Sequence, residues 1–235
     1  MVVDELERER AILDTAAVLL LRLGYNRLTM GDVADGVALH RGLVYLHFKS
    51  KDELVEAVAR RELERYSGRW RERLLADPQG GSVASVYRAM AGALQQLPLA
   101  AAVVARDQGI FGKYLRRPEN LFEKLETVGT QSFLQAMQQA GAIRAEIDTR
   151  AVAFVLDALT PALRQTFPRH GQAVTASALP STEQVVDALA ELLELGLTPS
   201  SGADLEAGKA VMLDALAGAQ AKFSDRFRCT ETEQR

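Results

Sequence analysis

Hydrophobic residues in this chain recur mainly at the three-to-four-residue spacing that places them on one face of an α-helix. The first clear run ends at Gly24, a residue suited to a helix C-cap, and its apolar positions are Ile12, Ala16, Leu19, Leu20 and Leu23. The same spacing predicts later helices over roughly 83–106, 118–140, 148–166, 181–197 and 204–225. No stretch alternates apolar and polar residues convincingly enough for a strand, so the predicted fold class is all-α.

Capping residues predict where three further helices begin. Thr29 can cap a short helix over about 30–36, with Asp32 at the third helical position. A second short helix fits about 40–46 after a turn of three or four residues. Ser50 and Glu53 form the S-x-x-E pattern of a capping box, which predicts a long helix running to about Leu75.

Turn-forming residues divide the chain into candidate domains. The clearest break is "DPQGGS" at residues 77–82, which is dense in turn formers. We therefore expect a small three-helix unit over 1–50, a connecting helix over 51–75, a helical bundle over 83–226 and a polar tail over 227–235.

Residues 29–48 fit two short helices that share a small core. The residues expected to face that core are Val33, Ala34, Val37, Val44 and Phe48. The second helix then presents the remaining side chains to solvent: Arg41, Gly42, Tyr45 and Leu46. An exposed arginine and tyrosine on a short helix that follows a tight turn are typical of the reading helix of a helix-turn-helix.

The chemistry of this face suits DNA. Arg41 can bond a guanine edge or a phosphate, and Tyr45 can donate its hydroxyl to a phosphate. Gly42 allows close backbone approach. Lys51 lies in the first turn of the long helix, where acids are preferred, and a phosphate nearby would remove that conflict. Spacing and charge alone leave an ordinary three-helix core with a solvated basic rim equally open.

Composition limits what the whole chain can bind. The 235 residues carry a net charge of −3, and the pI is about 5.7, so DNA binding has to come from a local patch rather than a general basic coat. No acidic residue occurs between Gly36 and Lys51. The single cysteine, Cys229, cannot form an intrachain disulfide, which suits a reducing compartment.

The sequence does not favour membrane insertion or secretion. The uncharged stretch 89–105 is shorter than the ~20 residues that span a bilayer, and it is interrupted by Gln95, Gln96 and Pro98. The N-terminus is charged where a signal peptide would be apolar. We expect a soluble, cytoplasmic protein.

The residues "T-x-x-D-V-A" followed by "R-G-L-V-Y-L-H-F-K-S-K-D-E-L" resemble the DNA-binding domain of TetR-type transcriptional regulators. The resemblance covers roughly residues 8–58. It implies DNA contacts from eight positions: Thr29, His40, Arg41, Gly42, Leu43, Tyr45, His47 and Lys51. It also implies a C-terminal regulatory domain, a homodimer, a pseudo-palindromic operator and a ligand-responsive repressor that needs no cofactor.

This chain departs from the family pattern at two positions. Ala38 stands in the turn where the family usually has glycine, and it fits only if φ stays negative or some strain is accepted. His40 stands where the family usually has serine or threonine at the start of the reading helix. We therefore consider His40 as a possible base or phosphate contact.

The predicted helices 148–166 and 181–197 carry apolar residues on more than one face, which indicates a second buried surface besides the core. The resemblance implies that they form the dimer interface through Val152, Leu156, Leu159, Leu163, Val186, Leu189 and Leu193. The alternative is that the last helix, 204–225, covers them within one chain.

Bulky apolar side chains in the central bundle can line a pocket for a small, mostly hydrophobic or aromatic effector. The candidate lining residues are Met90, Phe111, Phe133, Met137, Phe154 and Asp157. Asp157 lies in an otherwise apolar helix, so it is expected to be a buried carboxylate that needs a partner: the ligand, Arg164 or a neighbouring backbone group. Taken one at a time, these residues are more often ordinary core.

Other classes of protein fit less well. The chain has no phosphate-binding loop or nucleophile motif, so an enzyme is not expected. His40 and His47 could share a helix face, but no thiol or carboxylate completes a zinc site, and no metal is expected. A structural DNA coat would need broad positive charge. An all-α small-molecule-binding protein that does not read DNA remains the alternative function.

Overall fold

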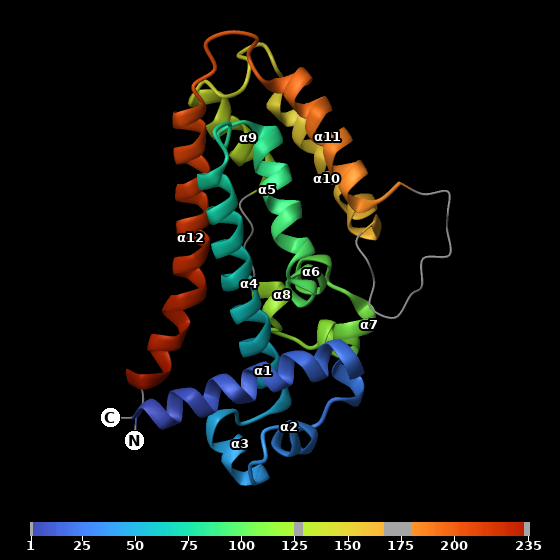
Figure 1. Ribbon diagram of the computed structural model, residues 1–235, viewed down its shortest axis with the longest axis vertical. Coiled ribbons are helices and arrows are strands. Elements are labelled where there is room, and N and C mark those ends of the chain that lie inside the picture. The colour runs from blue at the N-terminus through green and yellow to red at the C-terminus, as the bar shows by residue number, and fades with distance from the viewer. Residues whose placement is uncertain (1, 125–128, 167–179, 233–235) are drawn as a thin grey trace. The chain divides into compact units, whose positions relative to one another are not determined.

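A computed structural model describes residues 2–124, 129–166 and 180–232, and the side chains of 5–123, 129–159 and 180–218. Within those ranges every regular element is a helix (Figure 1), which confirms the all-α prediction. The chain forms two compact units, one of residues 1–63 with 98–126 and the other of 64–97 with 127–235. The first unit therefore adds a later segment to the N-terminal three-helix region predicted from the sequence.

The elements of the first unit are short except for α1 and α4. They are α1 (Val2–Arg27), α2 (Met30–Gly36), α3 (Arg41–His47), the start of α4 (Lys51–Ala76), α6 (Pro98–Ala105), α7 (Gln108–Phe111), the 3-10 helix η1 (Gly112–Arg116) and α8 (Leu121–Lys124). The second unit contains the rest of α4 together with α5 (Val83–Gln95), α9 (Thr130–Gln139), α10 (Thr149–Thr166), α11 (Thr182–Leu197) and α12 (Leu205–Thr232).

Gly24 interrupts α1 as the sequence predicted, although the helix resumes and ends at Arg27. Its φ of 70° and ψ of 162° are not helical, and only glycine adopts that φ readily. A Cβ at this position would lie 2.9 Å from the carbonyl oxygen of Gly109, so the kink also allows α7 to approach closely. Glycine is needed here both for the backbone angle and for the packing.

The predicted helix starts at α2 and α4 are confirmed. The Thr29 side chain accepts the N–H of Asp32 at 3.1 Å, and the Asp32 carboxylate accepts the N–H of Thr29 at 2.9 Å. At α4 the Ser50 hydroxyl accepts the N–H of Glu53 at 3.1 Å. The Glu53 carboxylate accepts the N–H of Lys49 at 2.7 Å instead of that of Ser50, so this box is shifted by one residue.

Two helices predicted as continuous are interrupted, and those predictions were wrong. The helix expected over 83–106 is α5 and α6, separated at Pro98, whose ring provides no N–H and starts the new helix. The helix expected over 118–140 is replaced by α8 and α9. Asn120 turns the chain into α8 by accepting the N–H of Phe122 at 2.9 Å, and α9 begins after Gly129.

The second unit has two hydrophobic clusters. In the larger one, α5 packs against α11 and α9 packs against α10, with Leu134, Met137 and Ala190 fully buried. The smaller one joins Met212 and Leu216 of α12 to buried residues of α4 and α5: Leu74, Val86 and Ala89. The last helix is therefore part of the fold of this unit, a role that the sequence left open.

Candidate nucleic-acid interface

The turn between α2 and α3 adopts a strained backbone. Ala38 has a φ of 53°, in the left-handed region that glycine favours. The turn is held by the N–H of Leu39, which donates to the carbonyl of Ala34 at 3.0 Å. Of the two possibilities that the sequence allowed for Ala38, the structure adopts the strained one. The angle of α3 relative to α2 depends on this turn.

His40 caps α3. Its Nδ1 accepts the N–H of Gly42 at 3.2 Å, the same function that the serine or threonine usual in the family performs. Because Nδ1 accepts, Nε2 carries the proton in the neutral ring and remains able to donate. A Cβ at position 42 would lie 3.2 Å from Nδ1, so Gly42 leaves room for the cap. His40 is thus a capping residue, and a DNA contact through Nε2 stays a prediction.

One side of α3 is buried and the other is open to solvent. Val44 is completely buried and Phe48 is nearly so, as predicted. Arg41, Gly42, Tyr45 and Leu46 are exposed, also as predicted. Leu43 is 36% exposed, and His47 is half-buried beside the Phe48 ring. Packing within this unit therefore explains why positions 44 and 48 are apolar, whereas the exposed side chains of α3 have no packing role.

Arg41 and Tyr45 form a pair one helical turn apart on this face. The guanidinium Nη2 of Arg41 donates to the Tyr45 hydroxyl oxygen at 3.0 Å. The guanidinium carbon also lies 5.3 Å from the centre of the Tyr45 ring, which adds a cation–π attraction. The pair restricts the long Arg41 side chain before any ligand binds, and the Tyr45 hydroxyl keeps its own proton for donation.

Lys51 makes contacts inside the protein. Its Nζ donates to the carbonyl oxygens of Tyr25 at 2.8 Å and Leu28 at 3.1 Å, and it lies 4.1 Å from the centre of the Tyr25 ring. Burial lowers the pKa of this ammonium below the usual value for lysine. Both carbonyls lie at the C-terminal end of α1, where a positive charge is favourable. They therefore compensate the unfavourable position of the Lys51 ammonium at the start of α4, for which the sequence suggested a phosphate. One N–H of Lys51 is left for another acceptor.

Three side chains that the sequence did not single out surround Lys51. The Tyr25 hydroxyl donates to the Asp52 carboxylate, and Arg117 Nε lies 3.5 Å from the other oxygen of Asp52. Burial, followed by the hydrogen bond to Asp52, raises the pKa of Tyr25. The network ties α1 and α4 to the segment after η1. Tyr25 and Arg117 lie far from Asp52 in the sequence, so no local spacing indicated that the three side chains would meet.

Residues 12–58, which include α2, α3 and the start of α4, match the sequence profile of the bacterial regulatory proteins of the tetR family. The N-terminal region of this chain is therefore similar to the DNA-binding domain of TetR-type regulators. The resemblance seen in the sequence is therefore confirmed over these residues, and α2, the turn and α3 have the arrangement of a helix-turn-helix.

Curated TetR-type relatives match only part of this chain. The HTH-type transcriptional repressor KstR2 of Rhodococcus jostii is 35% identical over 65 residues, which are 28% of this chain and 32% of the relative. The KstR2 of Mycolicibacterium smegmatis is 36% identical over the same length, again 32% of that protein. The chain therefore matches these relatives over less than a third of its own length and about the same share of theirs.

Solved structures extend the similarity of fold to most of the chain. The TetR-family regulator PfmR of Thermus thermophilus covers 80% of this chain and 99% of its own, with a TM-score of 0.52 and 20% identity. The fatty acid degradation regulator FadR of Bacillus halodurans covers 79% and 93%, with a TM-score of 0.54 and 16% identity. At these identities the comparisons show a common all-α fold and nothing about ligands.

The predicted effector residues of this TetR-type fold do not meet in one place. Phe111 lies in the first unit, where it packs against Tyr114 and Phe122 with ring centres 6.4 and 5.1 Å away. The others belong to the second unit, where Met137 is fully buried in the larger cluster, Phe133 packs against both clusters and Met90 is half-buried.

Two of these residues face solvent, contrary to expectation. Asp157 is exposed, and it accepts the hydroxyl proton of Thr130 at 2.5 Å, so the prediction of a buried carboxylate was wrong. Phe154 is 77% exposed and lines no interior cavity in this structure. Both lie on the solvent side of α10, which buries Ala153 and Leu156 instead. The side chain of Arg164 and the whole of Phe167 lie outside the described residues.

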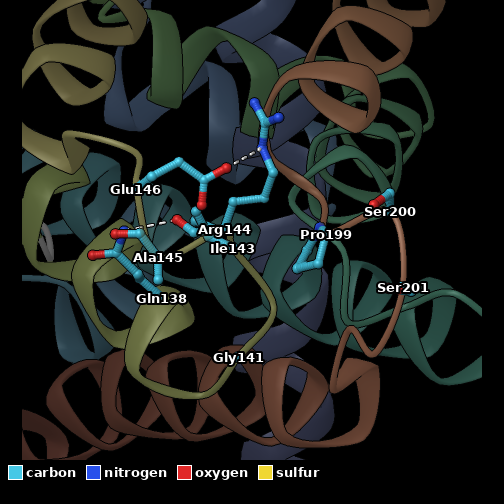
Figure 2. A pocket seen from close by; sticks show the side chains of 9 residues that line it. All are labelled: Gln138, Gly141, Ile143, Arg144, Ala145, Glu146, Pro199, Ser200 and Ser201. Atoms are coloured by element: carbon cyan, nitrogen blue, oxygen red, sulfur yellow. Dashed lines mark hydrogen bonds and ion pairs between the residues drawn. The ribbon is translucent and has the colours of Figure 1, made fainter.

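An open depression of about 380 Å³ lies at the end of α11 (Figure 2). The residues that line it come from the segments before α10 and after α11: Gln138, Gly141, Ile143, Arg144, Ala145, Glu146, Pro199, Ser200 and Ser201. Arg144 donates its backbone N–H to the carbonyl of Leu197 at 2.9 Å and its guanidinium to that of Gly196. Arg144 thereby caps the C-terminus of α11. None of the predicted effector residues lines this depression.

The predicted dimer residues include several that belong to the core. Leu156 and Leu193 are buried in the larger cluster, and Val152, Val186 and Leu189 are half-buried, so assigning the first two to an interface was wrong. Leu159 is exposed as an interface residue should be, whereas the side chain of Leu163 lies outside the described set. Other large apolar side chains are exposed on α10 and α11: Phe154, Val155, Leu192 and Leu195.

This exposed apolar face remains uncovered with α12 in place. The described part of α12 packs its buried residues against α4 and α5 through Leu74, Val86 and Ala89. The alternative in which the last helix covers α10 and α11 is therefore not what this structure shows for Phe154, Leu192 and Leu195.

Two other kinds of site are absent from the residues that the structure describes. No cluster of three or more histidine, cysteine or carboxylate side chains there has the arrangement of a metal site. No helix among them combines the length and apolar character needed to cross a bilayer.

Proposed function

We propose that this chain is a sequence-specific DNA-binding transcriptional regulator that acts as a homodimeric repressor on a pseudo-palindromic operator. The observation that carries the proposal is the solvent face of α3, which presents the preformed Arg41–Tyr45 pair within a TetR-family domain. A guanidinium held in this way can form two hydrogen bonds to a guanine edge or to a phosphate.

The contact residues divide into those that read DNA and those that hold the reading helix. Arg41, Gly42, Leu43 and Tyr45 lie on the open side of α3 and are proposed to contact bases or backbone. Thr29 and His40 cap α2 and α3. His40 keeps its Nε2 as a donor for a phosphate, whereas the Thr29 hydroxyl already donates to the Asp32 carboxylate at 2.7 Å and would have to exchange that bond. Lys51 supports the end of α1, and His47 is half-buried at the end of α3.

The exposed apolar face of α10 and α11 supports the homodimer. Monomeric proteins seldom expose several large apolar side chains together, and Phe154, Leu192 and Leu195 are all more than two-thirds exposed. We propose that a second copy of the chain covers this face. Two-fold symmetry then places two identical reading helices on one DNA duplex, and the operator would mirror that symmetry.

We further propose that a small, mostly hydrophobic effector lowers operator affinity by favouring a conformation of the dimer that DNA binds less well. Such an effector has to bind the two conformations unequally, and reciprocity requires operator DNA to weaken effector binding by the same factor. A compound that raises the melting temperature would be titrated with and without operator. Identical affinities in the two titrations would exclude this mechanism for that compound.

The alternative function is a small-molecule-binding protein that does not read DNA. To separate the two, purified full-length protein would select duplexes from a random pool at physiological salt. We expect enrichment of one pseudo-palindromic sequence by the wild type and loss of that enrichment by Arg41→Ala. Arg69→Ala is the matched control, because Arg69 is an exposed arginine on α4 paired with Glu72. A pool that stays random would contradict DNA reading and favour the alternative.

A further inference from the structure

Leu46 occupies the outermost point of the reading helix. At 3.6 residues per turn it lies roughly 200° around α3 from Val44, which is completely buried. Leu46 is 80% exposed, more than any other large apolar side chain that the structure shows as exposed. Tyr45 flanks it on one side, and Leu43 and His47 flank it on the other, whereas Arg41 lies roughly 140° around the helix. A partner that approaches α3 on the side opposite Val44 therefore contacts Leu46 first.

The residue one turn before Leu46 is Gly42, which has no side chain to hold a partner away. The apex of α3 is therefore a single leucine beside bare backbone, with the Arg41–Tyr45 pair next to it. An isolated exposed leucine is ordinary on a protein surface. Here its position matters, because Val44 and Phe48 already supply the packing of α3 and a polar side chain at position 46 would cost the fold nothing.

The major groove of DNA offers one apolar group at its floor, the C5 methyl of thymine, and apolar side chains contact it. In unmodified DNA only thymine carries that methyl. We propose that Leu46 reads the C5 methyl group of a thymine in each operator half-site. The inference rests on the proposed DNA-binding function and adds a residue that neither the family resemblance nor the burial of the core assigns.

The geometry also predicts where the thymine lies. Arg41 and Leu46 are five positions apart, a rise of roughly 7.5 Å along the helix, which corresponds to about two base-pair steps. The thymine should therefore lie about two base pairs from the guanine or phosphate that Arg41 contacts. A guanine and a nearby thymine would form the most strongly selected part of each half-site.

The test removes the methyl from the DNA and the side chain from the protein. Full-length protein is titrated against its selected duplex and against duplexes in which one thymine at a time is replaced by deoxyuridine. For one thymine per half-site, we expect the wild type to lose affinity roughly fourfold when one half-site is substituted and about fifteenfold when both are. Leu46→Ala should bind the thymine and deoxyuridine duplexes equally.

Because Leu46 is exposed, Leu46→Ala should keep the melting temperature and sedimentation of the wild type. If it changes the sedimentation, Leu46 contacts a second copy of the chain instead, and the proposal is overturned. If wild-type protein prefers its selected duplex over a scrambled one but tolerates deoxyuridine at every position, Leu46 does not read a methyl, while the proposed function stands. If no duplex is preferred, both fail.

Discussion

At the scale of single residues, α3 depends on two positions where this chain departs from the usual TetR-type pattern. His40 accepts the Gly42 N–H through a ring nitrogen, so a histidine replaces the usual hydroxyl without loss of the cap. Ala38 replaces the usual glycine only by adopting a φ of 53°. The sequence identified both positions but could not decide between strain and adjustment at Ala38, because local propensity does not fix φ when the surrounding helices do.

Relieving that strain should stabilise the protein. We expect Ala38→Gly to raise the free energy of unfolding by about 0.5–1 kcal/mol, since the cost of the left-handed conformation exceeds the added chain entropy of glycine. Urea denaturation would measure the change. Ala34→Gly, in the buried interior of α2, is the control and should lower stability by about 1 kcal/mol. A loss of stability in Ala38→Gly would show that Ala38 is not strained.

At the scale of elements, capping residues predicted correctly where helices begin, whereas the apolar pattern did not predict where helices are interrupted. Thr29 and Ser50 were predicted as caps and act as caps, because capping is a local interaction. The separate helices α5 and α6 and the short α8 were not predicted, because turns around Pro98 and Asn120 depend on packing between distant segments. The same reason explains why the Lys51, Asp52 and Arg117 contacts were missed.

The contacts of Lys51 predict a change in stability more than a change in DNA affinity. We expect Lys51→Met to lower the free energy of unfolding by about 1–3 kcal/mol, because the carbonyls of Tyr25 and Leu28 lose their donor. The dependence of DNA affinity on salt should keep its slope. Lys49→Met is the control at an exposed lysine and should leave stability unchanged. A slope reduced by about one for Lys51→Met would instead identify a phosphate contact.

At the scale of the whole molecule, the sequence predicted the all-α class and the apolar excess on α10 and α11 but not which residues face outward. Leu156 and Leu193 were assigned to the interface because apolar spacing does not distinguish a core stripe from an exposed one. For the same reason Phe154 and Asp157 were wrongly expected to be buried, since both lie on the open side of α10.

Introducing a charge on the exposed face should prevent dimer formation. Leu192 is 68% exposed on α11, so Leu192→Glu should leave the chain folded but make it sediment as a monomer at micromolar concentration, where the wild type is a dimer. Val18→Glu is the matched control, since Val18 is 63% exposed on α1 and should not affect the dimer. Wild-type protein that sediments as a monomer would contradict the proposed interface.

Buried tyrosines predict a loss of stability at alkaline pH. Burial raises the pKa of Tyr87 and of Tyr114 to about 12, so their contribution to stability is complete below pH 10 and is lost as the pH rises toward 12. The lowered pKa of Lys51 has the opposite effect, because it makes stability increase with pH up to about 10.5. Urea denaturation should show lower stability at pH 11 than at pH 9, by roughly 1 kcal/mol for each tyrosine. Tyr87→Phe should remove only the share of Tyr87, roughly 1 kcal/mol, because the pKa values of Tyr25, Tyr66 and Tyr114 are raised as well. An unchanged dependence would contradict this prediction.

The most direct test of sequence-specific DNA reading is the ratio of two affinities. The full-length protein would be titrated, at physiological salt, with its selected duplex and with a scrambled duplex of the same composition and length. We predict that the selected duplex binds at least about a thousandfold more tightly. Arg41→Ala should reduce that ratio at least roughly tenfold. A ratio near one for the wild-type protein would contradict the proposal that the solvent face of α3 reads an operator.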